Sequence, residues 1–241
     1  MIRKFIPASI KRKIRISQRN RADRKSGIVQ TFARAVKLPL KSVEVVSIEQ
    51  EIRYNQLAAN KVFNIGLAIK EIQQFVIQPN EVFSFWHIVG DPTKEKGYKT
   101  GRNIIGDSLK EDIGGGLCQV SGMIYHLALV SGMEIVERHN HTLDLYKEDG
   151  RYTPLGADAT VVYGYKDIRF KNTTSSPIYF NFKVSETNFR GAIFSPENLP
   201  IFEMNFERKE FDGYRTIETF RQNVSTQPAL INKSKYLLPQ I

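Results

Sequence analysis

A run of three glycines leads directly into an apolar helical pattern in the stretch Gly114-Gly115-Gly116-Leu117-Cys118-Gln119-Val120-Ser121. Apolar residues then recur at i, i+3 and i+4, which predicts a buried helix that begins near Leu117 and ends at Gly132. Cys118 is the single cysteine of the chain, and this helix places it in the first turn. Unpaired N–H groups and the helix dipole stabilise a thiolate there. The stretch therefore predicts a reactive thiol, although a lone cysteine is also often an inert buried residue.

Two histidines follow the predicted helix, in the segment Glu137-Arg138-His139-Asn140-His141. We expect residues 133–141 to form a strand. The alternation of side chains along a strand places His139 and His141 on one face, where either can meet Cys118. A histidine within hydrogen-bond reach of a cysteine takes the thiol proton and activates the sulfur as a nucleophile.

Carboxylates on two further predicted strands are candidates for orienting the histidine. We expect strands at residues 157–164 and 167–172, joined by a turn at residues 164–166, and these strands carry Asp158 and Asp167. In thiol acyl transfer, histidine moves the proton and a carboxylate fixes the histidine tautomer. The order of these residues along the chain is therefore consistent with a Cys-His-Asp site.

Metal and nucleotide sites are the competing interpretations of the same segments. Cys118, His139, His141 and Asp158 would make a thin zinc ligand set, because it draws on one cysteine and two closely spaced histidines. The glycine run lacks the Lys-Ser/Thr ending of a phosphate-binding P-loop. We therefore expect neither a metal nor another cofactor.

Four segments carry a resemblance to a known family. They read Asn-Glu-Val-Phe-Ser-Phe-Trp at residues 80–86, Gly-Gly-Gly-Leu-Cys-Gln-Val-Ser at 114–121, Glu-Arg-His-Asn-His at 137–141 and Asp-Ala-Thr-Val at 158–161. In these segments the chain resembles the VanW family, whose members are similar to a component encoded with vancomycin-resistance clusters. Related domains occur on bacterial cell-surface proteins with peptidoglycan-binding modules. The resemblance implies a bacterial protein linked to the cell wall or to the glycopeptide response, and its motif residues here are Cys118, Gln119, Asp158 and, in preference to His139, His141.

Two classes of function fit these residues. The first is a thiol amidase, peptidase or acyltransferase that acts on peptidoglycan or a precursor, with Cys118 as nucleophile, His141 as base and Asp158 as the group that orients the base. Gln119 or the backbone N–H groups of residues 116–118 are the expected oxyanion donors. The second class is a non-catalytic protein that binds wall fragments or antibiotic, in which Cys118 is structural. The residues expected to contact substrate are Gly114, Gly115, Gly116, His139 and Asp167.

Positive charge is concentrated at the start of the chain. The net charge is +10, whereas residues 1–41 hold thirteen Lys or Arg against one Asp, which gives +12 and leaves −2 for the remainder. Isoleucines at four-residue spacing within residues 1–42 predict a short basic amphipathic helix on an anionic membrane surface, and a solvated tail is the alternative. Nucleic acid is disfavoured, because the basic cluster lacks interleaved aromatic residues.

We expect the protein to lie in the cytoplasm, peripheral at the inner face of the membrane. The sequence shows no secretory signal pattern and no apolar run of 18 residues. With one cysteine, the chain forms no intramolecular disulfide, which is typical of reducing compartments.

Helical patterns dominate the first half of the chain and strand patterns the second. We expect a helix at residues 61–76 and a loop at residues 93–112 that covers a substrate. Strand patterns follow as two pairs, at residues 177–184 with 188–194 and at residues 201–208 with 214–223. These patterns predict an α+β fold, with helices packed on an antiparallel sheet. The expected organisation is a basic arm at residues 1–42, a VanW-like α+β domain at 43–200 and a strand-rich C-terminal extension at 201–241.

Overall fold

The computed structural model describes residues 7–36, 41–53, 56–105, 108–144, 151–223 and 227–238. Most of the helical residues lie in the first half of the chain, as the sequence pattern predicts. The helices are α1 (Ala8–Ser26), α2 (Ala58–Ile72), α3 (Phe85–Val89) and α4 (Leu117–Val130), with short 3-10 helices at Ile28–Thr31 and Lys94–Lys96.

Antiparallel sheets make up the remaining regular structure. The five-stranded sheet has the order β1 (Arg34–Ala35), β3 (Phe75–Ile77), β9 (Ile178–Val184), β10 (Asn188–Ser195) and β2 (Val43–Glu51). A three-stranded sheet has the order β4 (Val82–Ser84), β8 (Arg169–Lys171) and β7 (Glu134–Glu137). The C-terminal sheet consists of β11 (Glu203–Phe211), β12 (Tyr214–Gln222) and β13 (Ala229–Leu237), and β5 (Thr100–Ile105) pairs with β6 (Ser108–Ile113). The predicted α+β class is confirmed.

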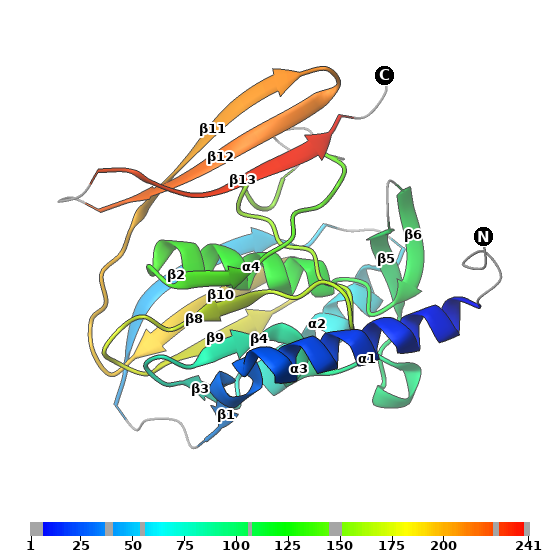
Figure 1. Cartoon of the computed structure of the whole chain (residues 1–241), viewed down its shortest axis with the longest axis horizontal. Helices are drawn as coiled ribbons and strands as arrows, with labels where there is room; N and C mark the ends of the chain where they lie inside the picture. The colour runs from blue at the N-terminus through cyan, green and yellow to red at the C-terminus, as the bar shows by residue number, and fades with distance from the viewer. Residues whose placement is uncertain are drawn as a thin grey trace.

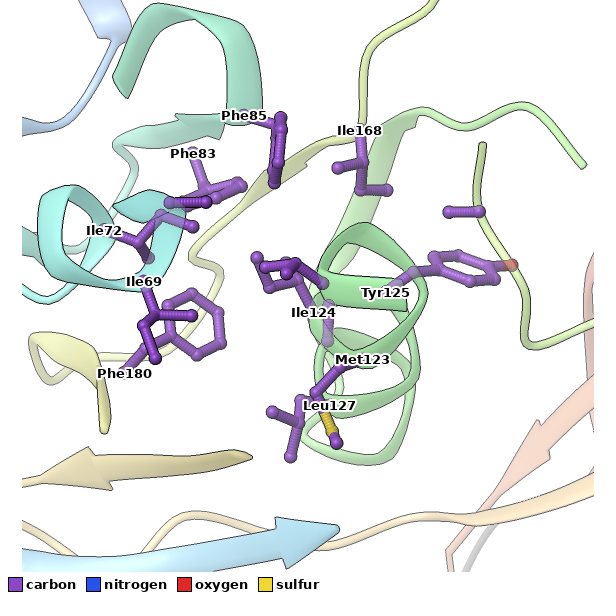
Figure 2. Packing of buried hydrophobic residues seen from close by; sticks show 14 of the residues in the cluster. Ile69, Ile72, Phe83, Phe85, Met123, Ile124, Tyr125, Leu127, Ile168 and Phe180 are labelled. Carbon is purple, nitrogen blue, oxygen red and sulfur yellow. The ribbon is translucent and has the colours of Figure 1, made fainter. Parts of the chain in front are cut away.

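Helix α4 occupies the centre of the core. It lies between the C-terminal sheet and the five-stranded sheet, as Figure 1 shows. Ile124 and Leu127 of α4 have no exposed surface and point toward Ile69 and Ile72 of α2 (Figure 2). Burial of this apolar face explains why a helix with so few charged residues is stable here.

A glycine lets α4 approach the sheet closely. A Cβ atom placed on Gly191 of β10 would lie 2.8 Å from Cγ of Met123 on α4, closer than real Cβ atoms approach other atoms. The missing side chain therefore allows Met123, which is fully buried, to pack directly against the strand backbone. This contact fixes the depth at which α4 sits, and with it the position of the first turn of the helix.

The two hairpins predicted at residues 177–194 and 201–223 agree with the structure. Strands β9 and β10 pair from Phe189 and Val184 onward, and β11 pairs with β12 along its whole length. The strand β2 was missing from the sequence prediction, although it pairs with β10 over nearly its full length. The strand lies at the edge of its sheet and exposes its glutamates. Its second half is therefore polar in composition and does not have the pattern of a strand.

Two predicted boundaries are wrong. Helix α2 ends at Ile72 rather than at residue 76, because Phe75 and Val76 pair with β1 and β9 as part of β3. The segment 93–112 is not an open loop. It contains the hairpin of β5 and β6, which extends from the side of the domain next to the start of α4 (Figure 1).

The strand predicted for residues 133–141 is also wrong beyond Glu137, where β7 ends. Residues 157–161 likewise lie in no strand, and the turn at residues 164–166 is held by a bridge between Val162 and Lys166. The N–H of Thr160 donates to the carbonyl oxygen of His139 over 2.8 Å. Single hydrogen bonds thus join the two segments in place of a strand ladder, and the predicted common face for the two histidines does not form.

Candidate functional site

Cys118 is the second residue of α4, so the predicted helix start is confirmed. Gly116 caps the helix with φ at 104°, and Gly114 has φ at 82°, a backbone conformation that favours glycine. Between them, a Cβ atom on Gly115 would lie 2.3 Å from the carbonyl carbon of Gly101 in β5. The three glycines therefore bring the β5–β6 hairpin against the loop that leads into α4. Cys118 stays partly exposed at this junction.

His141 connects Cys118 to Asp158. Its imidazole is close enough to the Cys118 thiol for each group to shift the pKa of the other, and its Nδ1 atom lies 2.7 Å from Oδ2 of Asp158. The backbone N–H of His141 donates to the same oxygen over 2.9 Å. Thr160 also contacts the sulfur, with Oγ1 at 3.6 Å from Sγ. The structure thus brings Cys118, His141 and Asp158 together at the N-terminus of α4.

The charges of this chain favour a thiolate next to an imidazolium. Burial raises the pKa of Cys118, but the hydrogen bond and positive charge of His141 outweigh it and hold that pKa below its usual value. Burial lowers the pKa of His141, whereas Asp158 and the Cys118 sulfur raise it to about 10. Asp158 has a pKa well below its usual range, because the charges of Arg138 and His141 overcome its burial. Near neutral pH the protein therefore holds the proton on His141.

Two residues that the sequence analysis did not select fix the other side of Asp158. Nη2 of Arg138 donates to Oδ1 over 2.8 Å, and the phenol of Tyr236 donates to the same atom over 2.5 Å. Arg138 also donates through Nε to the carbonyl oxygen of Asp158 and stacks on the ring of Tyr125. Arg138 lies inside the Glu-Arg-His-Asn-His motif, so the sequence could have identified it as a candidate site residue. Tyr236 comes from β13, and no local pattern connects it to the site.

The structure separates His139 and Asp167 from Cys118. Nε2 of His139 lies 3.0 Å from Oε1 of Glu137, and the N–H of Asp167 donates to the same oxygen over 3.1 Å. The carboxylate of Asp167 accepts from Ser84 and from Arg169. Of the paired alternatives, His141 and Asp158 contact the cysteine site, while His139 and Asp167 belong to a neighbouring cluster around Glu137.

The oxyanion alternatives also differ in placement. Nε2 of Gln119 donates to the carbonyl oxygen of Glu51 over 3.1 Å, so this amide points toward β2. The N–H groups of Leu117 and Gln119 donate to carbonyl oxygens of the glycine run, but within the described residues the N–H of Cys118 has no acceptor. That group and the N–H of Gly116, which likewise has no acceptor among the described residues, are available donors for a developing oxyanion.

The chemistry of these side chains does not require a metal. Asp158 accepts hydrogen bonds from Arg138, Tyr236 and His141, which occupies both of its oxygens with donors. Across the part of the chain that the structure describes, no group of three or more His, Cys, Asp or Glu side chains is placed to hold a metal ion.

Comparison with known proteins gives a family match. The family model described as "VanW like protein" matches residues 60–194, which include Cys118, His141 and Asp158. The chain is 39% identical over 130 residues to the uncharacterized protein YoaR of Bacillus subtilis (strain 168), covering 54% of this chain and 41% of that protein. It is 31% identical over 136 residues to the vancomycin B-type resistance protein VanW of Enterococcus faecalis (strain ATCC 700802 / V583), covering 56% of this chain and 50% of that protein.

The matched part spans half or less of the length of these two relatives. No solved structure matches the chain. Because the family match covers more than half of the 241 residues, the chain belongs to the VanW-like family.

Proposed function

We propose that this protein is a thiol-dependent amidase, peptidase or acyltransferase that acts on peptidoglycan or on a peptidoglycan precursor. The observation that carries the proposal is the cluster of Cys118, His141 and Asp158 at the N-terminus of α4, in which Asp158 holds the imidazole beside the thiol. A structural cysteine has no need of a charged histidine partner, whereas a nucleophile depends on one.

The reaction follows from the positions of these groups. The Cys118 thiolate attacks the carbonyl carbon of an amide, and the carbonyl electron pair moves onto oxygen near the Cys118 N–H. When the tetrahedral species collapses, the C–N bond breaks and His141 gives its proton to the leaving amine. Water or a second amine then attacks the thioester, His141 accepts the proton, and the thiolate leaves. Asp158 keeps the imidazole oriented throughout.

The choice of substrate rests on the relatives. One of the two relatives carries the name of a vancomycin B-type resistance protein, and peptidoglycan and its precursors are rich in amide bonds. A cytoplasmic location, at the inner face of the membrane, is part of the same proposal, and it places the site where precursors are made rather than on the mature wall.

Intact-mass spectrometry tests this proposal. The purified protein is incubated with soluble peptidoglycan fragments and precursor peptides, and we expect a thioester on Cys118 together with a released amine product. Cys118→Ala abolishes both, and His141→Ala slows product formation by roughly 10²–10⁴-fold, the usual contribution of a positioned acid–base group. His87→Ala, which removes an exposed histidine elsewhere, leaves the rate unchanged.

The opposite outcome is equally specific. If wild type and Cys118→Ala bind the same fragment with the same affinity and neither releases a product, the enzyme proposal fails. The protein is then a binding module for wall fragments or antibiotic, in which Cys118 is a packing residue.

A further inference from the structure

Helix α1 is attached to the domain through one of its faces. Arg12 pairs with Asp91, and Nη1 of Arg19 donates to Glu137 over 3.0 Å. Asp23 accepts two hydrogen bonds from Arg169, over 2.6 and 2.9 Å. This face is therefore held against β7, β8 and the loop after α3, and α1 crosses the lower front of the molecule in Figure 1, away from the C-terminal sheet.

Packing on the same face supports the ion pairs. A Cβ atom on Gly164 would lie 2.3 Å from Cγ1 of Ile16, so the glycine turn seats the helix closely. The guanidinium groups of Arg12 and Arg15 lie over the rings of Tyr163 and Tyr165, at 5.6 and 5.2 Å from the ring centroids. The inner face thus has specific partners, and the orientation of α1 about its own axis is fixed.

The outer face of α1 is basic and carries no acid. Asp23 is the single acidic residue between Ala8 and Ser26, and it points inward to Arg169. At 100° per residue, the outward stripe lies opposite the docked residues. A shallow groove runs along the flank of this stripe and is lined by Lys13, Ile16, Ser17, Asn20, Arg21 and Arg24.

Two apolar side chains continue the stripe toward the start of the helix. Ile10 and Ile14 lie one turn apart and are 48% and 43% exposed. An exposed isoleucine pair is unfavourable in water, but it suits a surface where basic groups meet phosphates and apolar groups enter the acyl boundary. Among the described residues, no helix combines the length and apolar character needed to span a bilayer.

We propose that the outward stripe of α1 binds the surface of an anionic phospholipid bilayer. The cations Lys13, Arg21 and Arg24 meet lipid phosphates, while Ile10 and Ile14 enter the interface. Nucleic acid fits less well, because the stripe has no aromatic side chain and includes exposed isoleucines where phosphate-binding groups would be expected. This inference does not depend on the chemistry at Cys118.

Co-sedimentation with lipid vesicles tests the inference. The full-length protein is mixed with phosphatidylcholine vesicles that contain or lack phosphatidylglycerol. We expect binding only to the anionic vesicles, with weakening at high salt. Reversing the charge at Lys13, Arg21 and Arg24 to Glu is expected to lower the affinity by at least roughly tenfold, given the contribution of each basic group near a charged membrane.

Matched variants separate lipid binding from general charge effects. Reversing Lys70, Lys94 and Lys183, which are exposed elsewhere, makes the same change in net charge and is expected to leave binding largely intact. Ile10→Ser with Ile14→Ser is expected to weaken vesicle binding and to leave binding to duplex DNA unchanged. Circular dichroism shows whether each variant keeps its helices.

Three results would overturn the inference. The first is the absence of binding to anionic vesicles by the wild-type protein. The second is an equal loss of binding in the two charge-reversed triples. The third is tighter binding to duplex DNA together with no effect of the isoleucine changes, which would make the stripe a general polyanion site.

Discussion

Asp158 is the residue on which the geometry of the candidate site converges. Its carboxylate accepts from His141 on one oxygen and from Arg138 and Tyr236 on the other. A buried carboxylate that accepts several donors remains ionised and has little freedom to rotate. Its negative charge stabilises the imidazolium of His141, and that imidazolium in turn stabilises the Cys118 thiolate.

Removing the charge of Asp158 tests its effect on the pKa values of His141 and Cys118. In Asp158→Asn, we expect the pKa of His141 to fall from about 10 toward its ordinary value, because a neutral amide no longer favours the imidazolium. The pKa of Cys118 is expected to rise with it. Titration of His141 by NMR measures the first change, and thiolate absorbance measures the second. Asp167→Asn, which removes a buried carboxylate of the neighbouring cluster, is the control and leaves both values in place.

The raised pKa of His141 also predicts how stability depends on pH. A group with a raised folded-state pKa stabilises the protein fully below its unfolded pKa, about 6.5, and this contribution is lost as the pH rises through about 10. Below about pH 8.5 the unfolded protein keeps its thiol proton, whereas Cys118 in the folded protein is ionised, and this difference offsets the loss. We therefore expect urea denaturation to show a decrease in unfolding free energy between about pH 8.5 and 10 that His141→Gln lacks. Parallel curves for the two proteins would contradict the assignment.

At the scale of elements, the glycine run determines where α4 begins. Gly116 supplies the left-handed cap, and the absence of a side chain at Gly115 allows the backbone of Gly101 in the β5–β6 hairpin to approach closely. Side chains at these positions would displace either the hairpin or the first turn of α4. The reactive geometry of Cys118 therefore depends on residues that carry no functional group.

Two glycine substitutions test this dependence. Gly115→Ala is expected to destabilise the protein by about 1–3 kcal/mol, because its Cβ would meet the backbone of Gly101. Gly66→Ala in α2 is the matched control, since no atom outside its own helix backbone lies within 4 Å of the added Cβ. We expect it to stabilise the protein by about 0.5–1 kcal/mol. Denaturant unfolding measures both, and equal effects would contradict the close approach of the hairpin.

At the scale of the whole molecule, the C-terminal sheet supports the site from outside the matched family region. The family match ends at residue 194, whereas Tyr236 in β13 is fully buried against Asp158. The phenol oxygen of Tyr236 also accepts from the N–H of Gly156 over 3.0 Å. The region beyond the family match thus contributes to the positions of the residues inside it.

Tyr236→Phe is the corresponding prediction. The substitution keeps the ring but removes three hydrogen bonds, to Asp158, Arg138 and Gly156, and leaves the Gly156 N–H without a partner, at a cost of about 1–3 kcal/mol. Tyr214→Phe in the same sheet is the control, and its stacking with Lys235 is kept, so we expect almost no change. Urea unfolding of the two variants decides the matter, and similar stabilities would show that the contact with Asp158 is unimportant.

Local patterns were sufficient for part of this architecture. The start of α4 and the hairpins of β9–β10 and β11–β12 follow from periodicity and turns between neighbouring segments. Strand β2 was missed because its pairing with β10 bridges most of the chain, and β13 was missed because its polar residues stand together instead of alternating with the apolar ones. Long-range pairing of this kind leaves no local signal.

The candidate site was predictable in its residues but not in its geometry. Cys118, His141 and Asp158 come together, although the predicted strands for His141 and Asp158 do not form. Arg138 and a backbone hydrogen bond from Thr160 to His139 hold these irregular segments. Those contacts direct His141 and His139 to different clusters, whereas alternation along a strand predicts that both lie on one face.

The most direct test of the central claim is the pH dependence of Cys118 alkylation by iodoacetamide, in wild type and in His141→Ala. We predict that wild-type Cys118 reacts well below the ordinary thiol pKa of about 8.5, and that the substitution moves the midpoint of the profile up to that value or beyond. A thiol that reacts only after denaturation, or a profile that His141→Ala leaves unchanged, would contradict a thiolate–imidazolium pair at this site.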